Sequence, residues 1–381
     1  MRRTVLVAAV LLVLALAVSA ETKIGPKGQV IIGGKPVIPL AVWDQPPYMF
    51  EYFSQLGITC VVGGRPERGA FRNQGRTMFP GAERNGMTLV TDYRDDARGE
   101  KTVIGWMGGL MVPGRIEDLK RHNQAIHQGD PSRFVISNID IHPFLRGGDD
   151  DFYKEAFKHA DAIISHVWPE VDAAKPNLRN VAVMIDRVRE LSKGRPGGEV
   201  SIWPDLNPHH WHGKQPGGGQ QYPAPTEEEL RFQIWLALIH GADAICIFPI
   251  SFEPFVYCQI PAKNEIELAW NTRLIERMTP ALTAEESPLA IKVTGDRQGG
   301  LVDVTTRTTG GKHYVFLVNG GREEQTVTLT VPGLGKEWLL RDAVAEKAIE
   351  VGGGTFSGKL PGLALRIWEL SPPSAPQAAP E

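Results

Sequence analysis

The stretch that most restricts how this chain can fold is Pro225–Phe252, with the sequence PTEEELRFQIWLALIHGADAICIFPISF. Thr226 and Glu229 form a capping-box pattern directly after a proline, and apolar residues then recur with the period of a helix. Gly241 stands where a helix ends. The continuous apolar run at 244–248 predicts a strand that is buried on both faces. The stretch therefore predicts a helix that leads into a parallel strand.

Similar units recur along the chain and predict a (β/α)8 TIM-like barrel, an α/β fold. An open doubly wound sheet is the alternative, but no Gly-rich nucleotide loop follows the first strand. The connection 94–101 is too short for a full crossover helix, so one unit is expected to be degenerate. The eight strands are expected near residues 39–43, 58–62, 87–91, 102–107, 134–138, 161–167, 199–203 and 244–248.

The composition changes after the barrel region. From about residue 288, short β-type runs alternate with Gly-rich turns, which predicts a small all-β sandwich. The last residues are rich in proline and alanine, and we expect them to be disordered. The expected domains are a signal peptide at 1–20, the barrel at 21–284, the β-sandwich at 288–371 and a tail at 372–381.

The N-terminus has the pattern of a secretory signal. Arg2 and Arg3 precede an apolar run at 5–18, and small residues end at Ala20. We expect cleavage after Ala20 and a secreted or periplasmic protein. An uncleaved membrane anchor is the alternative. No later stretch is long and apolar enough to span a bilayer.

Charge and cysteine content exclude some classes of protein. The formal net charge is −3, and no basic run stands out, so nucleic acid is not expected as a partner. Cys60, Cys246 and Cys258 form an odd set, and two of them lie in apolar strands, as small core residues do. A Cys246–Cys258 bridge stays open, as does the oligomeric state.

Candidate site residues follow from the barrel, because active sites in this fold lie where the strands end. Carboxylates near aromatic rings suit a carbohydrate, since acids transfer protons and flat rings stack on sugars. The alternative is that several of these acids cap helices or pair with arginines. The polar candidates are Asp44, Asp92, Asp140, His142, His166, Asp205 and Glu253, and the aromatic ones are Trp43, Trp106, Trp168 and Trp203.

The loop after the seventh predicted strand contains His209, His210, Trp211 and His212. Three imidazoles so close together raise the hypothesis of a metal-dependent hydrolase. The first strand has no histidine pair to complete such a site, so we expect neither a metal nor another cofactor. His209 and Trp211 are instead candidates for contacts with a sugar.

Two segments resemble a known family. GKPVIPLAVWDQPPYMFEYFSQLGIT, residues 34–59, is similar to the entry strand of secreted glycoside-hydrolase-like barrels of the β-galactosidase type. Residues 225–252 resemble the last helix and strand of those barrels, and the predicted sandwich matches as well. The likeness spans most of residues 28–370. It implies an acid/base glutamate at the end of strand four and a nucleophile at the end of strand seven.

The chain departs from this pattern at strand four, where residues 104–113 read IGWMGGLMVP without a carboxylate. Strand seven offers Asp205, so the resemblance implies that Asp205 stands at the position of the nucleophile and is the most important carboxylate. Glu253 is the preferred partner, because its strand neighbours strand seven and nearby phenylalanines would raise its pKa. Asp140 is the next choice, and Asp92 the third. A glycosidase and a catalytically silent carbohydrate-binding barrel are the two leading hypotheses.

Overall fold

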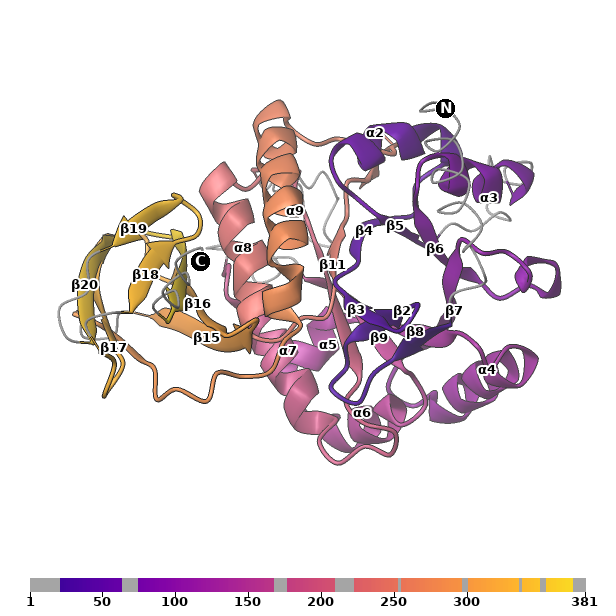
Figure 1. The fold of residues 1–381 in the computed structure, drawn as a ribbon. Coiled ribbons are helices and arrows are strands. Elements are labelled where there is room, and N and C mark those ends of the chain that lie inside the picture. Colours follow the sequence, from indigo (N-terminus) through magenta and orange to yellow (C-terminus); the bar gives the residue numbers. More distant parts are fainter. Residues whose placement is uncertain are drawn as a thin grey trace, which may run out of the picture. The chain divides into compact units, whose positions relative to one another are not determined.

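The computed structural model describes residues 21–63, 75–167, 177–209, 223–252, 255–296, 301–335, 338–349 and 354–372 (Figure 1). The predicted signal peptide and most of the predicted tail lie outside these residues. The chain divides into two compact units. The first contains the described residues up to Ser165 together with Arg189–Trp203, and the second contains His166–Val188 and the described residues from Pro204 on. The predicted domain boundaries stay predictions.

Eight parallel strands form a closed barrel in the order β10-β11-β4-β5-β6-β7-β8-β9. Closure confirms the predicted (β/α)8 fold and excludes an open doubly wound sheet. The strands are short and almost entirely buried, as expected for parallel strands covered by helices. They are β4 (Leu40–Trp43), β5 (Cys60–Val62), β6 (Thr88–Asp92), β7 (Val103–Met111), β8 (Phe134–Ile139), β9 (Ala162–Val167), β10 (Ser201–Leu206) and β11 (Ile245–Ile247).

Helices connect most of the barrel strands. Between β6 and β7 the described chain contains only the short 3-10 helix η3 (Asp95–Ala97), as the short connection there predicted. The sequence did not indicate α5, which follows β8 directly. The helices are η1 (Pro47–Met49), α2 (Phe50–Gln55), α3 (Gly75–Arg84), α4 (Ile116–Gly129), α5 (Ile141–Arg146), α6 (Asp150–Phe157), α7 (Asn180–Leu191), α8 (Glu227–Ile239) and α9 (Ala262–Leu282).

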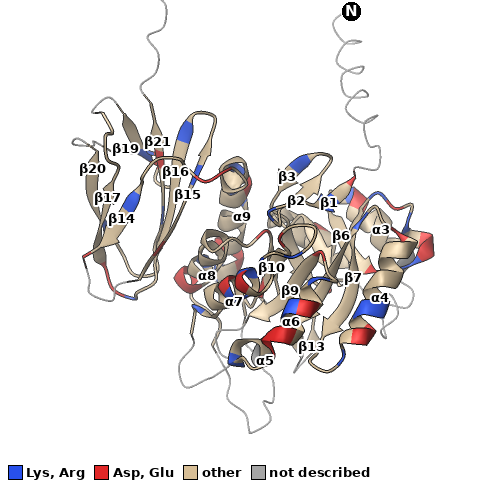
Figure 2. Ribbon diagram, turned by 90° about the horizontal axis from the view of Figure 1, so that it is seen from below, with Lys and Arg blue, Asp and Glu red and all other residues tan. Residues whose placement is uncertain are grey.

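Acidic and basic residues are interspersed on the helices, as Figure 2 shows for α4 and α6. Lys120 of α4 contacts Glu117 at 3.1 Å and Glu155 of α6 at 3.2 Å. These pairs lie at the surface, where water and salt screen them, so they contribute little to the stability of the fold. Among the described residues, no helix has both the length and the apolar character needed to cross a membrane.

The N-terminal β1 (Thr22–Ile24), β2 (Val30–Ile32) and β3 (Lys35–Val37) form a three-stranded antiparallel sheet. The predicted hairpin is present, with positive φ angles of 59° and 77° at Gly33 and Gly34. Glycine adopts these angles without steric cost, which explains the Gly-Gly pair.

The C-terminal region is the predicted all-β sandwich. One sheet has the order β14-β17-β20 and the other β15-β16-β21-β18-β19. Side chains of both sheets, such as Val315 and Leu329, share one buried apolar core. The strands are β14 (Lys292–Gly295), β15 (Val302–Thr309), β16 (Lys312–Asn319), β17 (Gln325–Thr330), β18 (Leu339–Asp342), β19 (Lys347–Ile349), β20 (Thr355–Leu360) and β21 (Leu365–Ser371).

Helix α8 begins with the predicted capping box. Thr226 Oγ1 accepts from the Glu229 N–H at 3.2 Å, and Glu229 Oε2 accepts from the Thr226 N–H at 3.0 Å. The helix is buried nearly all round. Trp235 stacks on Phe316 of β16 and donates to Asn271 of α9 at 2.8 Å. The sandwich and α9 therefore cover the faces of α8 that would otherwise contact water.

Candidate functional site

Strand β10 places Asp205 in the barrel wall. Side chains alternate along a strand, so Ser201, Trp203 and Asp205 share one face. Asp205 lies opposite Cys246 of β11 and is fully buried. The sequence predicted a strand at 199–203 that leads to Asp205. The strand instead continues to Leu206 and contains Asp205.

His166 of β9 contacts this aspartate. Its Nδ1 lies 2.5 Å from Asp205 Oδ2, although the angles at the contact fall short of those of a good hydrogen bond. The His166 side chain is 22% exposed and that of Asp205 is 0% exposed. The edge of the imidazole meets the ring of Phe248, with centroids 4.9 Å apart and planes at 79°. The structure thus brings two predicted site residues together.

Burial controls the electrostatics of Asp205. Removal from water raises the pKa of this carboxyl, and the facing His166 and the Cys246 thiol offset the rise only in part. A carboxyl with a raised pKa is able to retain a proton nearer to neutral pH. Such groups occur at catalytic sites more often than elsewhere.

Further buried polar groups lie in the segments after β10 and β11. Asn207 and Ser251 are each 1% exposed. Among the described residues, Asn207 Nδ2, Ser251 Oγ and both carboxylate oxygens of Asp205 meet no hydrogen-bond partner of good geometry. Buried polar atoms in folded proteins are almost always bonded. Several such atoms in these segments therefore indicate a place for water or a polar ligand.

The loop after β10 is fixed at both ends. The His209 N–H donates to Asn207 Oδ1 at 3.0 Å, and His209 is fully buried. Asn264 Nδ2 of α9 donates to the Pro208 carbonyl at 2.8 Å and to the Pro225 carbonyl at 3.0 Å. The residues between, 210–222, lie outside the described structure, and with them His210, Trp211 and His212. In the part of the chain that is described, no three His, Cys, Asp or Glu side chains are placed to bind a metal ion.

The first unit contains other predicted site residues at its strand ends. Asp44 directly follows β4, where Trp43 is half-buried. Its φ of 45° lies in the left-handed region, which is unusual for a residue other than glycine and recurs at functional sites. Asp92 is half-buried at the end of β6, and Asp140 is exposed just after β8.

Two of the tryptophans that were predicted to contact substrate pack against protein side chains. The buried Trp106 donates to Asp130 Oδ2 at 3.0 Å and packs under the Arg133 guanidinium at 5.5 Å. Trp203 is also buried, and its ring lies 5.9 Å from that of Phe134, the first residue of β8. These partners precede or begin strand β8. The two indoles are therefore packed near the start of β8, and their contact with a substrate stays a prediction.

Strand four of the barrel, β7, contains no carboxylate, as the sequence indicated. Its pairing with β8 shifts between Met107 and Leu110, which accommodates Gly108 and Gly109. A Cβ atom on Gly108 would lie 2.7 Å from Asn123 Oδ1 of α4. The glycines thus allow close packing between this strand and its helix.

Some predicted residues are not described, and others were missed. Glu253, Trp168 and Trp211 lie outside the described residues, and the side chain of His142 is not described. Asn207, Ser251 and the fully buried Gln45 were missed, because only acids, histidines and aromatic residues were considered. Their signal in the sequence was a neutral polar residue in or just after a predicted strand end.

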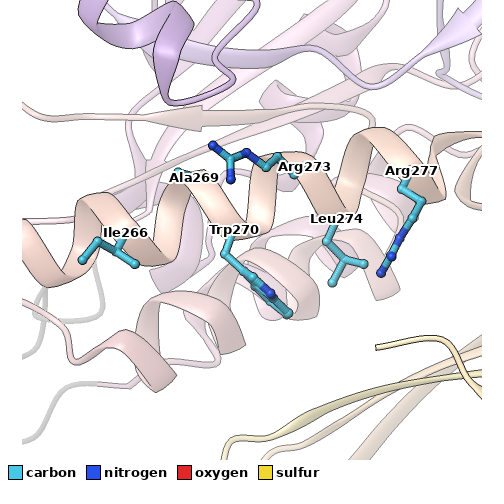
Figure 3. Close-up of a pocket in the computed structure, with 6 residues that line it drawn as sticks. All are labelled: Ile266, Ala269, Trp270, Arg273, Leu274 and Arg277. Atoms are coloured by element: carbon cyan, nitrogen blue, oxygen red, sulfur yellow. The ribbon is translucent and has the colours of Figure 1, made fainter. Parts of the chain in front are cut away.

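A separate hollow of about 580 Å³ lies on the surface of α9. Figure 3 shows that its lining residues project from one side of this helix, among them Ile266, Trp270 and Arg273. Trp270 is 36% exposed, and the Arg231 guanidinium covers its ring at 5.0 Å. The residues that line this hollow all belong to α9.

Comparisons with known proteins agree with the architecture. Residues 301–354 match the family described as beta-galactosidase C-terminal domain. No curated protein matches the chain. A solved structure described as a glycoside hydrolase covers 94% of this chain and 98% of its own, with a TM-score of 0.60 and 10% identity. A glycoside hydrolase family 5 structure from Bacteroides vulgatus covers 95% of both chains, with a TM-score of 0.60 and 8% identity.

A third structure, AmyP in complex with maltose, covers 88% of this chain and 97% of its own, with a TM-score of 0.55 and 9% identity. At such identities the likeness concerns the fold alone. The resemblance found in the sequence is confirmed at that level. The chain has the fold of glycoside hydrolases, a closed (β/α)8 barrel followed by a C-terminal β domain of the β-galactosidase type.

Proposed function

We propose that this protein cleaves an oligosaccharide or polysaccharide at the end of strands β9 and β10. The observation that supports this most is the fully buried Asp205, which lies 2.5 Å from His166 and whose pKa burial raises. Hydrolysis of a glycosidic bond needs a group that protonates the leaving oxygen, and a raised carboxyl pKa suits proton transfer near neutral pH. The glycoside hydrolase fold makes a sugar the leading substrate class.

The usual pair of carboxylates is incomplete in the described residues, because β7 contains none. Glu253 and Asp140 stay the proposed partners of Asp205. A separation of about 5–5.5 Å between two carboxyl groups is typical of retaining enzymes, and about 6.5–9.5 Å of inverting ones. Aromatic and polar residues at other strand ends, such as Trp43 and Asp44, are proposed to contact the sugar.

The absence of a carboxylate on β7 also favours a second candidate function, a barrel that binds sugars without cleaving them. Both functions need a carbohydrate partner and neither needs a cofactor. We propose in either case that the protein is secreted or periplasmic, on the basis of residues 1–20. This segment has the charge and apolar pattern of a signal peptide.

A screen of the mature protein separates the two functions. Release of reducing ends is measured across oligosaccharides and polysaccharides of differing sugar and linkage. Affinity electrophoresis in gels that contain the same polysaccharides measures binding. Cleavage of at least one glycan supports the glycosidase. Retardation without cleavage supports the silent binder. If a broad panel shows no cleavage and no retardation, both proposed functions are contradicted.

A further inference from the structure

We propose that His166 is the side chain that contacts the sugar and transfers the proton, while Asp205 is a positioning residue behind it. This inference rests on the proposed function, but it moves the proton transfer from Asp205 to His166. It follows from where each side chain meets solvent and from what surrounds each polar atom.

Exposure separates the two side chains. Both carboxylate oxygens of Asp205 and the Nδ1 atom of His166 are buried. The exposed 22% of the His166 side chain therefore belongs to atoms other than Nδ1. A sugar that enters from solvent meets this part of the imidazole before it can meet the carboxylate. The residue able to touch a substrate in this conformation is His166.

The surroundings of the imidazole fix its orientation. Asp205 contacts one edge of the ring at Nδ1, and Phe248 packs against it at a centroid distance of 4.9 Å. The Phe248 N–H donates to the Leu206 carbonyl at 2.8 Å, which fixes the end of β11 next to β10. The contact at one imidazole nitrogen determines which proton the other nitrogen exchanges. Asp205 thus directs Nε2 to proton transfer.

Charge explains why the two groups occur together. An isolated carboxylate at the position of Asp205 is costly, because burial removes its charge from water. In the proposed resting state a protonated His166 faces the carboxylate, and the pair is neutral as a whole. When Nε2 gives up its proton, the pair becomes negative. This negative charge would stabilise the positive charge that develops on the sugar as the glycosidic bond breaks.

The proton balance of the step is complete without a second carboxylate. The Nε2 proton of the His166 imidazolium moves to the glycosidic oxygen as the bond from this oxygen to the anomeric carbon breaks, and an alcohol leaves. A water molecule then bonds to the anomeric carbon from the same face. Its proton moves to Nε2, which restores the imidazolium. The same group acts first as acid and then as base, and the anomeric configuration is retained.

Kinetics on a substrate from the screen test the assignment. In His166→Gln we expect kcat to fall by about 10²–10⁴-fold with little change in KM, as for loss of general acid–base catalysis. His122→Gln is the matched control, because His122 is an exposed histidine on α4. A raised KM with unchanged kcat in His166→Gln would show that His166 only binds the sugar, and would overturn the proposal while the proposed function stands.

Chemical rescue tests the role of Asp205. We expect added imidazole to restore part of the rate of His166→Gly, and added azide to restore none to Asp205→Ala. A glycosyl azide product from Asp205→Ala would show that Asp205 attacks the sugar directly, and would overturn the positioning role. Asp205→Asn gives a second, nearly isosteric variant if Asp205→Ala does not fold.

A spectroscopic arm needs no substrate. We expect the ring resonances of His166 in NMR spectra, assigned by their loss in His166→Gln, to shift in Asp205→Asn. Ring resonances that stay unchanged in Asp205→Asn would contradict the contact. If the wild type cleaves no glycan in the screen, the proposed function fails and the proton-transfer role of His166 fails with it.

Discussion

The contribution of the ionised Asp303 carboxylate, on β15, to folding stability can be calculated from the ion pairs around it. Arg179 donates to the two carboxylate oxygens of Asp303 at 2.6 and 2.8 Å, and His240 Nε2 lies 3.0 Å from Oδ1. Arg179 precedes α7 and His240 follows α8. Their contacts with Asp303 therefore join the sandwich to these helices within the second unit. The Asp303 side chain is only 11% exposed.

The pKa of Asp303 gives the size of the effect. Burial acts to raise it, but the bonds from Arg179 and His240 outweigh burial and lower the pKa from 3.8 to about 2. At about 1.4 kcal/mol per pKa unit, this corresponds to about 2–3 kcal/mol of folding stability. Because the folded pKa is depressed, this stability is present above about pH 4 and is lost as the pH falls toward 2.

Asp303→Asn removes the charge with little change in shape. We expect the free energy of unfolding at pH 7 to fall by about 2–4 kcal/mol, since Arg179 also loses its ionic partner. Urea unfolding followed by circular dichroism at pH 7, 5, 4 and 3 measures this. The difference from wild type should shrink toward pH 3. The control is Asp151→Asn, which changes an exposed carboxylate on α6 and should alter stability by less than about 0.5 kcal/mol.

An Asp303→Asn variant within about 0.5 kcal/mol of wild type at pH 7 would refute this reasoning. A difference that stays constant down to pH 3 would also refute it, because the effect would then have no origin in the ionised carboxylate.

Burial acts to lower the pKa of His240, but the bonds of His240 with Asp303 and Asp186 raise this pKa overall. Its contribution is therefore complete below its unfolded pKa and declines as the pH rises through the folded value.

Three further predictions concern other parts of the chain. Thr226→Ala removes the side chain that caps α8 and should cost about 0.5–2 kcal/mol, measured as a lower midpoint in urea; an unchanged midpoint would contradict the cap. Gly108→Ala places a Cβ 2.7 Å from Asn123 Oδ1 and should destabilise the fold by about 1–3 kcal/mol. Gly114→Ala is the control: its Cβ would meet nothing within 4 Å, and its positive φ makes it a measure of backbone strain alone. N-terminal sequencing of exported protein should begin at Glu21, and an intact Met1 in a membrane fraction would argue against a cleaved signal.

Much of the fold could be predicted because local patterns and tertiary structure agree. The capping box and the apolar run after Gly241 defined α8 and β11 closely. Strands β19 and β20 were not predicted, because their sequences contain charged residues and Gly358, and pairing with neighbouring strands determines their conformation. Sequence patterns show such pairing only weakly.

The candidate site was predictable in part. Asp205 was identified because the end of strand seven is where this fold places its chemistry. Its contact with His166 was not predicted, because the adjacency of two barrel strands does not tell which of their side chains meet. The full burial of Trp106 and Trp203 could not be predicted, because the position of a residue in a strand does not tell which end of the barrel a long side chain reaches. Asn207 was missed because a neutral amide has no titratable group.

The most direct test of the central claim combines activity and stability in one variant. Burial raises the pKa of the Asp205 carboxyl, so ionising this carboxyl at higher pH costs folding stability. Asp205→Asn has no carboxyl to ionise and does not carry this cost. We predict that Asp205→Asn is at least as stable as wild type at pH 8 in urea, yet releases reducing ends at least about 10²-fold more slowly. A folded Asp205→Asn variant with a near-wild-type rate would contradict the claim that glycan cleavage takes place at the Asp205–His166 pair.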